Sequence, residues 1–210
     1  MQTHEAAQNF YLTINVPLGK FMGKHVALSS FFFNSVMPPE LSSERLTLQP
    51  LSVDDHQFIM ELVNTKGWIE FIGDRNIHSK EDAVAYIERI LSNADITYWV
   101  VRTKEDNALA GVITFIKREY LPHRDIGFAF LPEHAGKGYA YEATNVVLQH
   151  VAKDRSDDTV LATTLPHNFS SIKLLEKLGL RFSKQIVVDE QELYLYSMPI
   201  GTLERSSGNE

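Results

Sequence analysis

Residues 132–143 (Pro-Glu-His-Ala-Gly-Lys-Gly-Tyr-Ala-Tyr-Glu-Ala) have the composition and spacing of a loop that binds an anion through its backbone. Gly136 and Gly138 allow a ligand to approach the main chain closely. The segment joins a run typical of a strand to one typical of a helix. Unpaired N–H groups from 136 to 140 then lie at the positive end of a helix dipole, and this predicts a cradle for a diphosphate. A glycine turn that only begins a helix is the alternative interpretation.

Two other phosphate-binding motifs do not fit this loop. A P-loop ends in Gly-Lys-Ser/Thr, but here Tyr139 follows Gly138 and Lys137 precedes it. A dinucleotide-binding fingerprint needs a small residue where Tyr141 stands, and it normally follows the first strand of a parallel sheet. The expected context of this loop is different, because it follows an antiparallel meander.

Hydrophobic periodicity predicts the elements that position the loop. We expect strands over 45–51, 97–103, 110–117, 125–131, 159–165, 181–188 and 193–198. We expect helices from Ser52, from Ser79, over 139–153 and over 170–178, the last ended by Gly179. Short connections within 97–131 indicate a meander, and the helix over 139–153 makes a β-α-β crossover. The predicted fold class is α+β: a mixed, mostly antiparallel sheet of about seven strands with helices on both faces.

The chain length predicts one domain. Of the 210 residues, 44% are hydrophobic and 22% charged, which is typical of a globular protein. We expect a domain over 41–200, an N-terminal extension of unassigned role over 1–40 and a flexible tail over 201–210. The first ten residues contain no Lys or Arg, unlike the start of a secretory signal.

Composition also excludes several functions. The absence of cysteine rules out a thiolate nucleophile or thiolate zinc site and fits a reducing, cytoplasmic location. No apolar run approaches the roughly 18 residues of a membrane helix. The net charge of -7 argues against nucleic-acid binding and favours cationic partners such as amines. The eight histidines form no H-E-x-x-H motif, so no metal is expected.

Four stretches, in one order, resemble the GNAT superfamily of N-acetyltransferases. They are Asp-Ile-Gly-Phe from 125, Gly-Lys-Gly-Tyr-Ala from 136, Asn-Phe-Ser-Ser from 168 and Glu-Lys-Leu-Gly from 176. The resemblance covers about 44–199, including Glu-Arg-Leu from 44, and is strongest to the ribosomal-protein N-terminal acetyltransferases of the RimJ and RimL kind. It implies direct transfer of an acetyl group from acetyl-CoA to an amine.

The family writes its acetyl-CoA loop as Gln/Arg-x-x-Gly-x-Gly/Ala. Gly138 and Ala140 match the last two fixed positions, whereas Ala135 stands at the Gln/Arg position and removes one side-chain contact. The resemblance implies cofactor contacts along the whole loop: Ala135, Gly136, Lys137, Gly138, Tyr139 and Ala140.

The resemblance also implies positions for the thioester and for a base. The thioester carbonyl is expected against a backbone N–H near Phe130 or Leu131, where the strand over 125–131 splays from its neighbour. Asp125 stands on that strand, where the family often carries an acid that takes a proton from the amine through water. A solvated strand-end aspartate, or a partner of Arg124, is the alternative.

Further along the chain, the resemblance implies three more contacts. The Asn168 amide is expected to bond the pantetheine arm, and Ser171 to donate to the leaving thiolate, because Leu175 replaces the tyrosine that many members use. The alternatives are a helix N-cap for Asn168 and a first-turn serine for Ser171. Lys173 and Lys177 are candidates for the 3′-phosphate, or else belong to a solvated helix face.

Aromatic and acidic residues before the meander are candidates for the acceptor site. Trp68, Phe71 and Trp99 would shape an acceptor pocket or else belong to the core. Glu70 and Asp74 would receive a cationic acceptor. The expected function is transfer of acetyl to a primary amine, first a protein or peptide N-terminus and second a small amine or amino acid. A non-catalytic acyl-CoA-binding module is the rival, and a homodimer is compatible with either.

Overall fold

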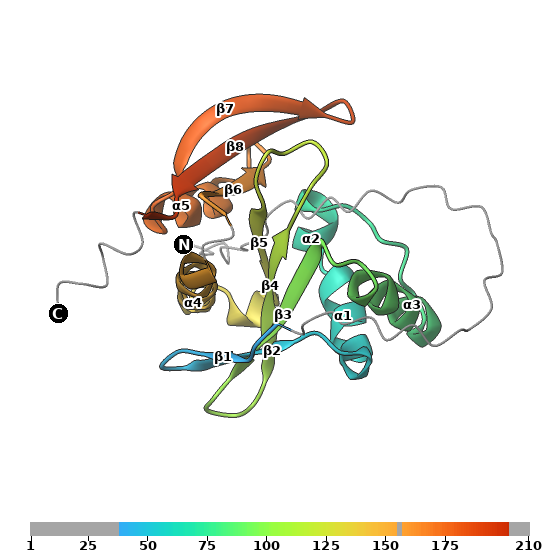
Figure 1. The fold of residues 1–210 in the computed structure, drawn as a ribbon. Coiled ribbons are helices and arrows are strands. Elements are labelled where there is room, and N and C mark those ends of the chain that lie inside the picture. The colour runs from blue at the N-terminus through green and yellow to red at the C-terminus, as the bar shows by residue number, and fades with distance from the viewer. Residues whose placement is uncertain (1–37, 155–156, 202–210) are drawn as a thin grey trace, which may run out of the picture.

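Eight strands form one mixed sheet in the computed structural model, which describes residues 38–154 and 157–201 (Figure 1). The strands lie in the order β1-β2-β3-β4-β5-β6-β8-β7. Their bounds are β1 Leu41–Ser42, β2 Leu46–Pro50, β3 Ile96–Thr103, β4 Leu109–Ile116, β5 Asp125–Phe130, β6 Thr159–Thr164, β7 Arg181–Val188 and β8 Gln191–Pro199. All neighbouring strands pair antiparallel except β5 and β6, which are parallel.

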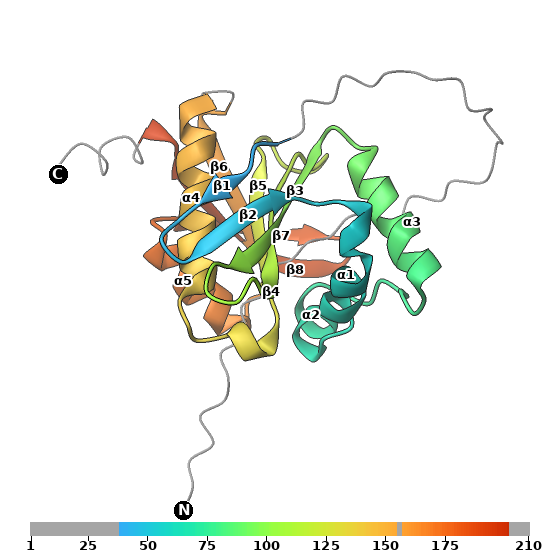
Figure 2. The same cartoon turned by 90° about the horizontal axis from the view of Figure 1, so that it is seen from below.

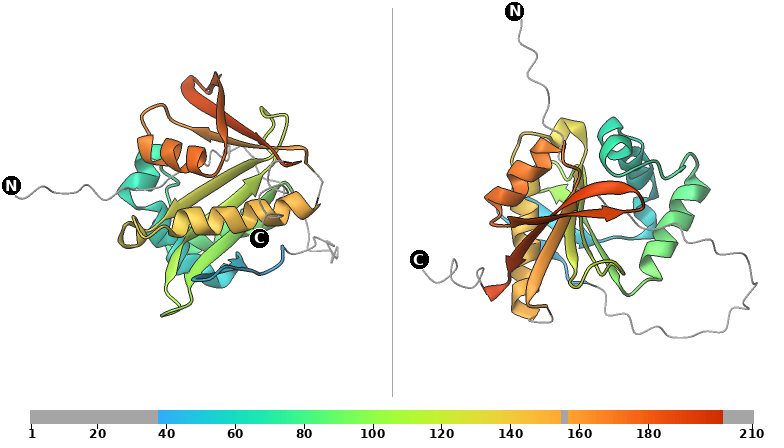
Figure 3. Two further views of the ribbon diagram at one scale, coloured as in Figure 1. Left: turned by 90° about the vertical axis from the view of Figure 1, so that its left-hand side faces the viewer. Right: turned by 90° about the horizontal axis from the view of Figure 1, so that it is seen from above.

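Helices cover both faces of this sheet. They are α1 His56–Val63, α2 Lys66–Phe71, α3 Lys80–Leu91, α4 Tyr139–Asp154 and α5 Phe169–Lys177, with short 3-10 turns η1 Val53–Asp55 and η2 Pro132–His134. Figure 2 and the right-hand view of Figure 3 show α1, α2 and α3 on one side and α4 and α5 on the other. The predicted fold class is therefore confirmed.

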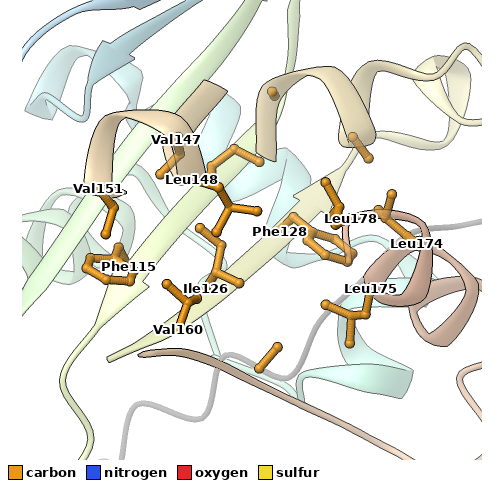
Figure 4. Close-up of a cluster of buried hydrophobic side chains, with 14 of the residues drawn as sticks. Phe115, Ile126, Phe128, Val147, Leu148, Val151, Val160, Leu174, Leu175 and Leu178 are labelled. Carbon is orange, nitrogen blue, oxygen red and sulfur yellow. The ribbon is translucent and has the colours of Figure 1, made fainter. Parts of the chain in front are cut away.

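The central strand β5 is buried along its whole length, which explains its nearly continuous apolar sequence. Ile126, Phe128 and Phe130 pack on the α4 and α5 side, and Ala129 packs on the α1–α3 side. Figure 4 shows the cluster on the α4 and α5 side, in which Val147 of α4 and Leu174 of α5 lie beside the β5 side chains. β5 thus carries the chain from the core, through η2, into the loop over 135–138, here called the glycine loop.

The parallel strands β5 and β6 separate soon after they meet. Their register contains one pair, Asp125 with Leu161, and the Leu161 N–H donates to the Arg124 carbonyl at 3.0 Å. β5 continues to Phe130 and β6 to Thr164 without a further pair among the described residues. A split therefore opens between the two strands toward their carboxyl ends, where the glycine loop and α5 begin.

Two elements were not predicted. β1 has two residues and α2 has six, one of them Gly67, so neither shows a clear hydrophobic period. The helix expected from Ser52 divides into η1 and α1, and α2 follows as a separate helix, which Thr65 caps by accepting from the Trp68 N–H. Residues 1–37 and 202–210 of the expected extension and tail lie outside the described residues.

Candidate active site

The glycine loop follows η2 and turns the chain into α4. Gly136 and Gly138 have φ angles of +72° and +81°, in the left-handed region that glycine adopts without strain. A side chain at Gly136 would meet no atom within 4 Å, so the loop is open to solvent on that side. A plain turn that only begins a helix does not need two left-handed residues within three positions, as Gly136 and Gly138 are here.

The first turn of α4 presents main-chain donors beside this loop. The Glu142 N–H donates to the Gly138 carbonyl at 3.1 Å and is the first such bond of the helix. The N–H groups of Tyr139, Ala140 and Tyr141 precede it and have no acceptor within the helix. Ala140 is 5% exposed and belongs to the core cluster on the α4 and α5 side, so its side chain is not offered to a ligand.

Cationic side chains surround this helix end in a protein of net charge -7. The Arg45 guanidinium lies 4.8 Å from the Tyr139 ring centre, and the Lys177 ammonium lies 4.5 Å from that of Tyr141. Lys137 is exposed within the loop, and Lys173 is exposed on α5. The loop, the helix dipole and these charges suit the diphosphate and 3′-phosphate of CoA.

The ladder between β4 and β5 decides which β5 N–H groups face the split. The Leu131 N–H donates to the Ala110 carbonyl at 2.9 Å, so it points toward β4. Successive N–H groups of a strand point to opposite sides, so those of Phe128 and Phe130 point toward β6. Both residues lie beyond the Asp125–Leu161 pair, and both are buried. The Phe130 N–H therefore faces the split, where a carbonyl-binding N–H is expected, whereas the Leu131 N–H is already bonded to β4.

Asp125 is bound by Arg118, a residue that the sequence did not indicate. The Arg118 Nε lies 2.8 Å from each Asp125 carboxylate oxygen, and the two residues are 5% and 1% exposed. Burial raises the pKa of the Asp125 carboxyl, and the Arg118 charge together with its hydrogen bonds offsets part of this rise. Arg124 instead lies 3.8 Å from Asp157, so the alternative of a solvated aspartate or Arg124 partner is wrong.

Asn168 and Ser171 meet at the start of α5. The Asn168 side-chain oxygen accepts from the Ser171 N–H at 3.1 Å, which makes Asn168 the N-cap of the helix. Both residues are buried, at 2% and 0% exposed. Leu175, at the position of the family's tyrosine, is fully buried in the α4–α5 cluster. The N-cap alternative for Asn168 is therefore confirmed.

The aromatic acceptor candidates do not line one pocket. Trp68 and Trp99 are 0% and 2% exposed and pack on opposite faces of the sheet, so both are core residues. The Trp99 indole donates to the Pro39 carbonyl at 3.0 Å. Phe71, at the end of α2, places its ring 5.8 Å from that of His167, which precedes the Asn168 cap. This contact joins the end of α2 to the connection between β6 and α5, and no local sequence pattern indicated it.

The acidic acceptor candidates are exposed. Glu70 lies on the surface of α2, and Asp74 accepts from the Asn76 N–H at 2.7 Å. Within 38–154 and 157–201, no three His, Cys, Asp or Glu side chains are grouped so as to hold a metal ion. No helix among those residues is long and apolar enough to cross a membrane.

Comparison with known proteins gives the same family. The model of the acetyltransferase (GNAT) domain matches residues 45–181. The uncharacterized N-acetyltransferase YnaD of Bacillus subtilis is 27% identical over 141 residues, which are 67% of this chain and 82% of YnaD.

Solved structures share the fold at lower identity. A GNAT-family acetyltransferase from Bacillus anthracis has a TM-score of 0.67 at 24% identity, over 78% of this chain and 99% of its own. RimL, a ribosomal L7/L12 α-N-protein acetyltransferase in complex with coenzyme A, has a TM-score of 0.67 at 14% identity, over 77% of this chain and 98% of the RimL chain. A mutant of the spermidine N-acetyltransferase SpeG of Vibrio cholerae has a TM-score of 0.65 at 19% identity, over 79% of this chain and 99% of the SpeG chain. With its glycine loop, its split sheet and a family model covering more than half its length, this chain belongs to the GNAT family of acetyltransferases.

Proposed function

We propose that acetyl-CoA binds in the split between β5 and β6, with its diphosphate at the glycine loop and its pantetheine arm along β5. The observation that carries this proposal is the direction of the Phe128 and Phe130 N–H groups. Both are main-chain donors of buried residues aimed away from β4, and buried donors require a partner. The amides of pantetheine and the thioester carbonyl are suitable acceptors, and the arm would then join β5 like an added strand.

This arrangement lets the protein polarise the thioester without a side chain. A backbone N–H fixed in a β-ladder is a preorganised donor for an oxygen that gains charge during acyl transfer. Phe130 or Phe128 supplies that donor, because the next N–H, of Leu131, is bonded to Ala110.

Asp125 is the proposed proton acceptor for the attacking amine. An amine must be neutral to attack, and most amines are protonated at neutral pH. Asp125 shares its face of β5 with Ala129, which packs on the α1–α3 side, so the amine would approach from that side. The burial that raises the pKa of its carboxyl makes it a stronger base than an exposed aspartate.

Ser171 is the proposed donor to the departing thiolate. It lies at the open end of the split, beside the Asn168 cap, on a helix whose N-terminus favours negative charge. The Asn168 amide is proposed to hold the pantetheine arm close to Ser171.

For the acceptor we propose the α-amine of a protein or peptide, on the strength of the likeness to the RimJ and RimL branch. A cationic small amine is the second candidate, favoured by one surface hollow of about 470 Å³. Asp54, Glu61 and Glu133 line this hollow together with Asp55, whose carboxylate is paired with Arg102 at 3.2 Å. Three carboxylates outside that ion pair would attract a polyamine.

An acceptor panel tests both the activity and the acceptor class. The protein is incubated with acetyl-CoA and with a peptide, the same peptide blocked at its N-terminus, or spermidine, while thiol release and product mass are followed. We expect thiol release with the free peptide and none above background with the blocked peptide. Turnover with spermidine alone would favour the second candidate. CoA binding without turnover of any amine would favour the rival hypothesis of a non-catalytic acyl-CoA-binding module.

A further inference from the structure

Arg45 connects the first hairpin of the sheet to the glycine loop. It lies in the turn between β1 and β2, and its Nη1 donates to the Lys137 carbonyl at 3.1 Å. Its Nε donates to a Glu142 carboxylate oxygen at 2.7 Å, and its guanidinium lies over the Tyr139 ring. One side chain thus contacts the loop, the first residue of α4 and the first turn of that helix.

The bond to Lys137 fixes the direction of the next N–H. No cis peptide occurs among the described residues, so the C=O of Lys137 and the N–H of Gly138 point in opposite directions across their shared peptide plane. Arg45 holds the C=O, and the N–H is therefore aimed away from Arg45. A charged donor on the carbonyl also polarises the peptide, which makes this N–H a better donor to an anion.

Glu142 holds the Arg45 turn in place. One of its carboxylate oxygens accepts from the Ser43 hydroxyl at 2.7 Å and from the Arg45 N–H at 2.9 Å, while the other pairs with the Arg45 side chain. The turn at 43–45 is thereby fastened to the start of α4. The Arg45 charge also neutralises a carboxylate that would otherwise repel an anion at this helix end.

We propose that Arg45 is a positioning residue for the diphosphate of acetyl-CoA: it orients the Lys137–Gly138 peptide so that the Gly138 N–H faces the ligand. This inference rests on the proposed function, because it assigns the diphosphate to the glycine loop. Arg45 acts through the peptide, because it binds the C=O edge of the peptide plane and the N–H points out from the opposite edge. Its guanidinium is already shared between Lys137 and Glu142.

The test compares two acetyl donors. Acetyl-CoA carries the diphosphate, whereas acetyl-pantetheine carries the same thioester and arm without it. For Arg45→Ala we expect the KM for acetyl-CoA to rise about tenfold or more, while kcat/KM with acetyl-pantetheine stays within about twofold of the wild-type value. Arg89→Ala is the matched control, since Arg89 also lies over a tyrosine ring, that of Tyr86, but on α3 across the sheet. Arg89→Ala should leave the kinetic constants with both donors unchanged.

Three outcomes would overturn the inference. Equal losses with both donors would mean that Arg45 only supports the fold. An unchanged KM for acetyl-CoA would mean that the loop orients itself. An Arg45→Lys variant with wild-type KM would mean that charge alone suffices, because one ammonium cannot reproduce the forked contacts with Lys137 and Glu142. A wild-type protein that bound no CoA would instead refute the proposed function itself, and the inference with it.

Discussion

The Nε atom of Arg118 lies 2.8 Å from both carboxylate oxygens of Asp125, at the point where β5 and β6 make their one pair. A buried ion pair contributes little net stability, yet removing one partner costs about 3–5 kcal/mol because the other charge stays buried. Asp125 therefore has a structural role beside its proposed chemical one, and the two roles are separable.

We expect Asp125→Asn to lower both stability and rate, and Asp125→Asn/Arg118→Met to recover most of the stability. If Asp125 is the base, the double variant stays slow, and its defect shrinks as pH rises because more of the amine is already neutral. Thermal unfolding and the pH dependence of kcat/KM provide the two measurements. Recovery of full activity in the double variant would leave Asp125 with its structural role alone.

Gly138→Val should weaken CoA binding about tenfold or more, equal to about 1.4 kcal/mol, because a β-branched residue is strained at a φ of +81° and the N–H changes direction. Gly73→Val is the control, since Gly73 also has a positive φ, +102°, but follows α2. Calorimetry with CoA distinguishes them. Wild-type CoA affinity in a folded Gly138→Val protein would show that the diphosphate does not bind at this loop.

Two replacements of Asn168 separate its cap from its amide. Asn168→Ala should cost about 1 kcal/mol of stability, because the Ser171 N–H loses its acceptor. Asn168→Asp keeps a cap oxygen for the Ser171 N–H and loses the amide donor, so CoA affinity should fall about tenfold while the helix remains capped. If Asn168→Asp binds CoA as tightly as the wild type, the cap is the whole role of this residue.

Ser171→Ala should reduce turnover about ten- to a hundredfold with acetyl-CoA binding nearly unchanged, which is the signature of a lost donor to the leaving group. Ser170→Ala, on the preceding and partly exposed residue, should have no such effect. Steady-state kinetics measure both. Full activity of Ser171→Ala would direct attention to Tyr194 and Tyr196 of β8, of which Tyr196 is 3% exposed with a pKa raised by burial.

Glu142 should make stability depend on pH. Burial alone would raise the pKa of its carboxyl, but hydrogen bonds from Ser43 and Arg45 outweigh burial and hold that pKa below its usual value. A lowered pKa stabilises the fold above the ordinary glutamate pKa and loses this contribution as pH falls through the lowered value. We expect Glu142→Gln to cost about 1 kcal/mol at neutral pH and progressively less as pH falls below the ordinary glutamate pKa. Thermal unfolding should show no such convergence for the exposed Glu105→Gln control.

Local patterns in the sequence predicted most of the fold and the loop. Alternation and apolar runs predicted β2 to β8, and two nearby glycines before a helical period predicted the loop that begins α4. Pairs distant in sequence left no local pattern, as with Arg45 and Glu142, which are 97 residues apart. Arg118 belongs to a non-periodic connection, so its pairing with Asp125 depends on how β4 and β5 fold together. The short helix α2 was missed because six residues cannot show a helical period.

A crystal structure of the protein with coenzyme A would test the central claim most directly. We predict diphosphate oxygens within hydrogen-bond distance of the Gly138 and Ala140 N–H groups. The pantetheine arm should lie between β5 and β6 beyond the Asp125–Leu161 pair, with its amides bonded to the Phe128 and Phe130 backbone. Coenzyme A bound outside this split, or with its diphosphate away from residues 136–140, would contradict the account.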